Sequence, residues 1–458
     1  MKITKDMTEG NIYKNFLLYA LPLIISTLLS SAYSTIDAMI AGKFISEHAL
    51  GAISATGSYE LMFQALFDGF TAGFSIYIAQ KFGKKDFLAI KRDSVNMGIF
   101  VLLASVIISV LSIIFRDPIL DYLKVDPILR DDAQTYFVIY ASGYFLIYIN
   151  LFLVKVLYAL GITSFALYVS FISAVLKICG NLLSVLVLDW GIAGLAFFSV
   201  LSSASATVCY LIMLRKAFKE LQTEKTSYRF SFSCVLNSLR YTIPAAVQQV
   251  AFHGVGLIIA PSINALGAAA TTGYNVSNRI YTLGTQSLWG VTSAFTCHTA
   301  QCVGKGDYTK VKRGLKVSFI MNCSMMLPFV LIISIFAKPI SSIFFPAGFV
   351  GDAYIYAVRY AMIYLPFIYV QLVGHILHAY MRSLGSMNMV LGITIFGSAI
   401  RIISTILLVR VMHIEGAYLG QIISWAADAI LSTAIVICGY RTLEQIKRVA
   451  ERIKIKKA

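Results

Sequence analysis

Apolar segments long enough to cross a bilayer, separated by short polar connections, run through the whole chain. A helix needs about 20 apolar residues to span the hydrocarbon core, and such a helix satisfies its backbone hydrogen bonds internally. Only 13% of the residues are charged, about half the share found in soluble domains. The 458 residues hold about twelve such segments and leave no room for a sizeable soluble domain. We therefore predict an all-α membrane protein.

The approximate spans are the apolar runs between charged, proline or glycine breaks. They are 15–41, 50–81, 94–115, 133–158, 163–188, 192–215, 237–264, 268–302, 315–337, 353–381, 388–411 and 415–439. We expect an N-terminal six-helix lobe at 1–216, a cytoplasmic linker at 217–236, a C-terminal six-helix lobe at 237–440 and a basic cytoplasmic tail at 441–458.

The net charge of +16 resides in the short connections and the tail rather than on one amphipathic face, so no nucleic-acid partner is indicated. Basic connections stay on the cytoplasmic side of a membrane. We expect a multi-pass protein of the inner or plasma membrane with both termini in the cytoplasm. The seven cysteines form no CxxC pair, so neither a disulfide framework nor a zinc site is indicated.

An internal repeat is the most specific signal. The motif Ala79-Gln80-x-x-Gly83-Lys84-x-Asp86 recurs in the second half of the chain as Ala300-Gln301-x-x-Gly304-Lys305-x-Asp307. At nearly the same offset, Leu160-Gly161 and Lys177 recur as Leu384-Gly385 and Arg401. With six spans per half, both halves enter the membrane in the same sense. The twelve helices should therefore form two lobes related by a pseudo-twofold axis along the membrane normal.

The motifs and their order resemble the multidrug and toxic compound extrusion (MATE) family. The resemblance covers nearly the whole chain and rests on Thr8-Glu9-Gly10-Asn11-Ile12, Ala20-Leu21-Pro22, Asp37, Gly42, Ala55-Thr56-Gly57, Trp190-Gly191-Ile192-Ala193-Gly194, Ile243-Pro244-Ala245-Ala246, Glu415-Gly416-Ala417 and the repeated turns. It implies secondary active efflux of organic, cationic or amphipathic compounds in antiport with protons or sodium ions. We expect a monomer that needs a small-molecule substrate and the lipid bilayer, and no cofactor other than the coupling ion.

Other function classes find less support. No GxxxxGK[ST] loop is present, which disfavours an ATP-driven pump. No nucleophile elbow or HExxH motif is present, so we do not expect an enzyme. The remaining alternative is a flippase for a lipid-linked sugar or another lipid, because such proteins resemble MATE transporters in fold. A strongly cationic cavity would favour the flippase, whereas the charges within the predicted spans are mixed.

Asp37 is the first candidate for ion coupling. It shares a helix face with Tyr33 and Ser34, in a span that is otherwise apolar. The resemblance implies that Asp37 is the coupling acid and that Asn181 is a polar partner in the fifth span. Ionised groups within a membrane are costly and mark functional sites, although a structural aspartate near the helix end is the alternative.

Lys177 departs from the family pattern, which has a small polar residue at this place. Lys177, Asn181 and Ser184 share one helix face at a depth similar to that of Asp37. An ammonium near Asp37 would occupy the place of a sodium ion, which favours proton coupling. The alternative is that Lys177 only compensates charge, or points away and never meets Asp37.

The remaining candidates are polar residues within the predicted spans, which we assign to a substrate cavity. Each has a structural hydrogen bond as its alternative. His375 and His378 make a weak metal site without nearby carboxylates, so we predict none. We expect Gln249 and His253 to face the histidines across the C-terminal lobe. The full set comprises Tyr33, Ser34, Glu60, Asp68, Ser184, Gln249, His253, Gln371, His375, His378 and Asp428.

Overall fold

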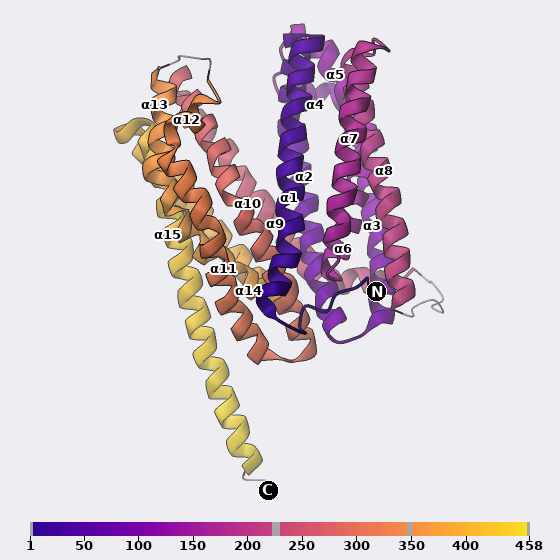
Figure 1. Cartoon of the computed structure of the whole chain (residues 1–458), viewed down its shortest axis with the longest axis vertical. Coiled ribbons are helices and arrows are strands. Elements are labelled where there is room, and N and C mark those ends of the chain that lie inside the picture. The colour runs from indigo at the N-terminus through magenta and orange to yellow at the C-terminus, as the bar shows by residue number, and fades with distance from the viewer. Residues whose placement is uncertain (1–2, 222–229, 346–349, 456–458) are drawn as a thin grey trace. The chain divides into compact units, whose positions relative to one another are not determined.

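The computed structural model describes residues 3–221, 230–345 and 350–455, and this part of the chain is helical without any strand (Figure 1). The side chains of Ser34 and of residues 440–455 lie outside the description. The first half contains α1 (Ile12–Ile40), α2 (Glu47–Gly83), α3 (Phe87–Ile114), α4 (Arg116–Tyr122), α5 (Arg130–Ser142), α6 (Tyr144–Ala159), α7 (Ser164–Leu186) and α8 (Gly191–Glu220). A π-helical turn, Ala41–Ile45, joins α1 to the cap of α2, and a 3₁₀ turn, Pro127–Leu129, precedes α5.

The second half begins with α9 (Phe232–Asn264), α10 (Ala268–Lys305), α11 (Tyr308–Ile335) and the short α12 (Ala337–Ser342). α13 (Asp352–Arg359) continues through a π-helical and a 3₁₀ turn, Tyr360–Tyr364 and Leu365–Phe367, into α14 (Ile368–Ser383). α15 (Met387–Ile455) comprises two helices joined at His413, whose backbone is not helical (φ 53°).

Within the described residues, nine helical segments are long and apolar enough to cross a membrane. The pair formed by Pro127–Ser142 and Tyr144–Ala159, bent by 48°, adds a tenth. The prediction of an all-α membrane protein is therefore confirmed. α10 is long enough but too polar to count, because its 38 residues carry many Thr, Ser, Asn and Gln side chains.

The chain divides into two compact units. The first consists of Met1–Val250 with Cys297–Gly314, and the second of Ala251–Thr296 with Leu315–Ala458. The start of α9 and the end of α10 thus pack within the first unit. The expected lobe boundaries at 216 and 237 stay a prediction, although α8 continues to Glu220 and α9 begins at Phe232, so part of the expected linker is helical.

The repeated turns share one backbone geometry. Lys85 and Gly306 stand at equivalent places, and both have positive φ, 60° and 79°. The next residues, Asp86 and Asp307, accept hydrogen bonds from backbone N–H groups three residues later. Each carboxylate therefore caps the helix that follows it. The second repeated turn behaves likewise, with Gly161 at φ 78° and Gly385 at φ 90°.

The ends of α2 and α10 cross at the repeated turns, within the first unit. A Cβ on Gly83 would fall on the carbonyl oxygen of Gln301, and a Cβ on Gly304 would fall on the carbonyl oxygen of Gln80. Only glycine permits such backbone contact. Each glycine thus contacts the residue that precedes the equivalent glycine by three positions, as expected if a pseudo-twofold axis relates the two repeats. The backbones of α2 and α10 touch directly at this crossing.

Candidate functional site

Asp37 forms an ion pair with Lys177, across the contact between α1 and α7. Lys177 Nζ lies 2.5 Å from Asp37 Oδ2, and Asn181 Nδ2 donates a hydrogen bond of 2.8 Å to Asp37 Oδ1. Asn181 is fully buried, whereas the side chains of Asp37 and Lys177 are 19% and 18% exposed. The acid is thus held in place by a buried amide and remains within reach of a solute.

Helical spacing explains how the three side chains meet. Lys177 and Asn181 are one turn apart on α7 and present one face to α1. Tyr33 lies one turn before Asp37, and its ring centre is 5.2 Å from Lys177 Nζ, a cation–π distance. The structure therefore brings together Asp37, Lys177, Asn181 and Tyr33, and it excludes the alternative in which Lys177 never meets Asp37.

Ser184 lies on the same face but contributes no contact to Asp37. Its hydroxyl donates to the carbonyl of Asn181 on its own helix, at 2.9 Å, and the side chain is fully buried. A Cβ on Gly194 would meet Ser184, so α7 and α8 are closely packed there. The side chain of Ser34 falls outside the described part.

A second ion pair in the first unit holds Asp68 of α2. Lys155 Nζ of α6 lies 2.8 Å from Asp68 Oδ1, and Gln249 Nε2 donates to Asp68 Oδ2 at 3.2 Å. The expectation that Gln249 faces the histidines of the second half is therefore wrong. The reason is that glycines bring α2 against α9: a Cβ on Gly69 would meet the backbone of Ala245 and Ala246.

Glu60 of α2 differs from Asp37 and Asp68 of the same unit, because it has no ion-pair or hydrogen-bond partner within the described residues. Its Oε1 is buried and unpaired. The charge of Lys177 acts on Glu60, and the charge of Glu60 acts in turn on four tyrosines that follow each other every four residues along α5 and α6. These residues, the tyrosine ladder, are Tyr136, Tyr140, Tyr144 and Tyr148. Neighbouring ladder rings lie 5.4 to 5.9 Å apart.

The polar residues of the second unit form a separate cluster. His378 Nε2 lies 3.2 Å from Asp428 Oδ1, without the alignment of a hydrogen bond. Gln371 Nε2 donates to Tyr281 and lies 3.1 Å from His375 Nε2. His375 packs edge-on against Trp289 and Phe252, and Phe252 also contacts His253. Gln371, His375, His378 and Asp428 are therefore brought together, and among the described residues no group of His, Cys, Asp or Glu is suited to a metal ion.

A strap at the amino terminus was not anticipated from the sequence. Residues 3–9 form this strap, which binds three parts of the first unit. The backbone of Ile3 donates to Glu220 of α8 at 2.6 Å, and that of Lys5 to the carbonyl of Leu160 at 3.0 Å. The backbone N–H of Met7 donates to Gln301 Oε1 at 2.8 Å. The strap therefore joins the repeated turn at Gln301 to α8 and to the turn between α6 and α7.

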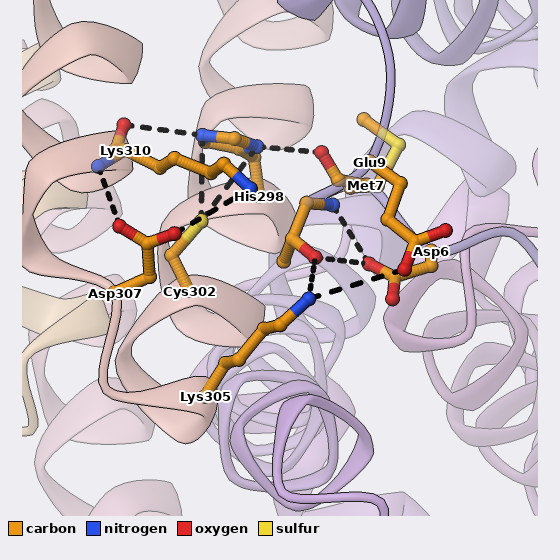
Figure 2. A network of polar contacts seen from close by, with 9 residues as sticks. Asp6, Met7, Glu9, His298, Cys302, Lys305, Asp307 and Lys310 are labelled. Atoms are coloured by element: carbon orange, nitrogen blue, oxygen red, sulfur yellow. Dashed lines mark hydrogen bonds and ion pairs between the residues drawn. The ribbon is translucent and has the colours of Figure 1, made fainter.

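His298 and Lys305 complete the contact between the strap and α10, as Figure 2 shows. The fully buried His298 places Nδ1 2.7 Å from the Met7 carbonyl oxygen and Nε2 3.4 Å from the Lys310 carbonyl oxygen. Lys305 Nζ donates to Thr8 at 3.4 Å and lies 3.9 Å from Glu9. The Thr-Glu-Gly motif thus has a structural partner in the second copy of the repeated turn.

Comparison with known proteins identifies the family. The MatE family model matches residues 22–183 and 244–407 of the chain. The chain belongs to the MatE family. The two matched stretches begin at Pro22 and Pro244, so each carries one copy of the repeated motifs. The expectations of MATE membership, and of a transporter rather than an enzyme, are confirmed.

Comparisons with curated relatives and solved structures are consistent with membership of the MatE family. The chain is 24% identical to the probable multidrug resistance protein YpnP of Bacillus subtilis, covering 84% of this chain and 86% of YpnP. It is 23% identical to the probable multidrug resistance protein YoeA of the same organism, over 75% of each chain. An outward-facing MATE transporter of the MOP superfamily, 18% identical, superposes with a TM-score of 0.87 over 97% of this chain and 100% of that one. The MATE fold is thereby established.

Proposed function

We propose that the protein is a secondary active transporter that exports organic cations or amphipathic compounds in exchange for protons. The observation that carries the proposal is the partly exposed carboxylate of Asp37, paired with Lys177 and held by Asn181. An accessible acid within a span is a natural proton-binding group. The two Bacillus relatives bear names of multidrug resistance proteins, which supports export of small organic molecules.

Proton coupling is favoured over sodium coupling by the position of Lys177. The ammonium group of Lys177 contacts the carboxylate of Asp37. A sodium ion at this site would need the same carboxylate oxygens as ligands and would compete with the ammonium group. A neutralised carboxylate attracts a metal ion less, whereas a proton can displace the ammonium from it. Protonation of Asp37 would release Lys177 and let α1 and α7 separate, which biases a two-state transporter towards its other state.

The two halves differ at this site. Arg401 takes the place of Lys177 in the repeat, and Ile259 stands in the second matched stretch where Asp37 stands in the first. Ile259 is buried and apolar, so the second half lacks an acid at that place. We therefore assign ion coupling to the first half and keep Gln371, His375, His378 and Asp428 as candidate substrate contacts.

Twelve spans in two lobes fit the helices better than ten. The break at His413 divides the 53-residue stretch Met387–Gly439 into two segments, each long enough to span. α10 corresponds in the repeat to the span α2. Adding α10 and the second part of α15 to nine helices and the bent pair gives twelve, six in each half. An even number per half, with basic connections inside, supports a multi-pass cell-membrane protein with both termini in the cytoplasm, and we propose that it acts as a monomer.

A lipid flippase receives less support from the charges. Lys81, Lys155 and Lys177 lie within spans of the first unit, and each is paired with a carboxylate. These three lysines therefore do not provide the uncompensated positive charge that a lipid diphosphate requires.

Transport by the purified full-length chain in proteoliposomes tests the proposal. Ethidium, a fluorescent organic cation, should move against an imposed proton gradient, and Asp37→Asn should abolish that movement while the protein remains folded. Ethidium transport driven by a sodium gradient alone would contradict proton coupling. Flipping of a labelled lipid without ethidium transport would favour the alternative.

A further inference from the structure

The strap, residues 3–9, lies across the ends of α6, α8 and α10 and contains neither helix nor strand. Most of its contacts use its own backbone, as in the hydrogen bond of 2.6 Å from the Ile3 N–H to the Glu220 carboxylate. Of its residues only Met7 and Thr8 are buried. A segment with so few buried contacts opens at a lower cost in free energy than a packed helix.

Met7 is the residue by which the strap holds α10. Its N–H donates to Gln301 Oε1 at 2.8 Å, and its carbonyl oxygen accepts from His298 Nδ1 at 2.7 Å (Figure 2). Both partner side chains are fully buried. Gln301 Nε2 donates in turn to the carbonyl of Ala159 at the end of α6, at 3.1 Å. The strap, α10 and α6 are therefore joined through one glutamine side chain.

Cys297 lies inside the same joint. Its Sγ is 3.4 Å from the carbonyl oxygen of Tyr158 and 3.7 Å from that of Ala159, and the residue is only 5% exposed. Tyr19 of α1 donates to the same Tyr158 carbonyl at 3.0 Å. The end of α10 must therefore move away from α6 before a reagent can reach this thiol.

The equivalent end of α2 is fastened in a different way. Asp93 of α3 is buried, accepts a hydrogen bond from Tyr77 at 2.8 Å and pairs with Lys81 at 2.8 Å. At the offset that relates the repeated motifs, Gly314 and Cys302 stand where Asp93 and Lys81 stand in the first copy. The second copy therefore cannot form this ion pair, and the strap supplies its fastening instead.

The two fastenings differ in the cost of opening them. Breaking a buried ion pair leaves an uncompensated charge and is strongly destabilising. The contacts of Met7 with α10 are neutral hydrogen bonds, which exchange for hydrogen bonds with water at a small net cost. The end of α10 can therefore be released while the end of α2 stays fixed.

We propose that the strap is a releasable latch on the end of α10. While Met7 is bound, this end stays in the first unit. When Met7 leaves Gln301 and His298, the end of α10 separates from α6 and the cytoplasmic side opens. α10 suits this motion because it begins in the second unit and ends in the first. The inference rests on the proposed transporter, which must open to the cytoplasm to take up its substrate.

The reaction of Cys297 with N-ethylmaleimide, followed by mass spectrometry of the purified full-length protein, measures release of the latch. His298→Phe keeps an aromatic ring beside Phe16 but removes the hydrogen bond to Met7, so it should raise the reaction rate about tenfold. Tyr77→Phe is the matched control, because it removes the hydrogen bond of the equivalent residue in the first copy. It should leave Cys297 protected.

Glu220→Ala tests the latch from its far end. This variant removes the acceptor of the Ile3 N–H, four residues before Met7, and should also raise the reaction rate of Cys297. Adding His298→Phe to Glu220→Ala should raise the rate little further, because both substitutions release the same segment.

Several outcomes would overturn the inference. They are a Cys297 that stays protected in both single variants, and single-variant effects that multiply in the double variant. An equal rise at Cys234, a buried thiol on α9, would show general loosening instead of release. In membrane vesicles, an impermeant maleimide should reach Cys297 of His298→Phe from the cytoplasmic face only, and reaction from the outer face would contradict the latch. If labelling behaves as expected but no gradient drives ethidium transport, only the proposed function fails.

Discussion

The glycine crossing between the two repeated turns makes a quantitative prediction. In Gly304→Ala, the new Cβ would stand 2.8 Å from the carbonyl carbon of Gln80 and closer still to its oxygen, whereas ordinary contact begins at 3.4 Å. α2 and α10 must then separate by at least about 0.6 Å, because the obstacle is backbone and has no rotamer to change. Gly83→Ala meets the backbone of Gln301 in the same way.

Overpacking of this kind costs about 1–3 kcal/mol. The double variant should lose less free energy of unfolding than the two single variants together, because the first substitution already moves α2 and α10 apart. Thermal unfolding in detergent, monitored by tryptophan fluorescence, gives a Tm for each variant, so that their stabilities can be ranked. Gly57→Ala is the matched control on α2, because its Cβ would meet nothing within 4 Å and alanine favours a helix. Equal Tm values for Gly83→Ala and Gly57→Ala would refute the close crossing.

Three further predictions follow from the site, a helix cap and the topology. Lys177→Asn should restore a small polar residue beside Asp37 and make ethidium efflux respond to sodium; efflux that stays indifferent to sodium would show that the lysine does not set ion choice. Hydrogen bonds from the backbone and the side chain of Lys310 lower the pKa of Asp307 in the folded protein. The stabilisation that Asp307 gives as a helix cap is therefore fully present above the pKa of the unfolded state, and it is lost as the pH falls through the lower pKa of the folded state. Asp307→Ala should therefore cost about 1 kcal/mol at neutral pH and nothing at strongly acidic pH, whereas Asp307→Asn should retain the cap. Single cysteines at Lys85 and Gly306 should react only with reagents that reach the cytoplasm, and labelling of either in intact cells from outside would contradict the assigned topology.

Helical periodicity allowed much of the ion-coupling site to be predicted. Helix faces and depths placed Asp37, Lys177 and Asn181 at similar heights in two spans, and the family resemblance named Asn181 as the polar partner. Whether Lys177 meets Asp37 stayed open until the structure showed the ion pair. The partner of Asp68 did not follow, because it depends on which helices α2 contacts. Gln249 reaches Asp68 from α9, which packs closely against glycines on α2, and Lys155 reaches it from α6.

Some contacts between distant parts of the chain could not be predicted, because no residue pattern in the sequence marks them. The strap binds Gln301 through a backbone amide, and any residue type except proline could supply that group at position 7. The break in α15 at His413, by contrast, falls in the predicted connection between the spans 388–411 and 415–439. The segment 268–302 was predicted as a span because it is a run between charged breaks, although α10 is too polar to count among the helices that are apolar enough to cross a membrane.

The strap has a consequence for biosynthesis. Met7 and Gln301 are 294 positions apart, so the strap leaves the ribosome long before the residue that binds it has been made. Until α10 is inserted, His298 and Lys305 are absent, and the strap can hold only the ends of α6 and α8. The contact between the strap and α10 can therefore form only after the second copy of the repeated turn has been synthesised. A substitution that weakens the strap should therefore impair the joining of α10 to the first helices rather than the insertion of those helices.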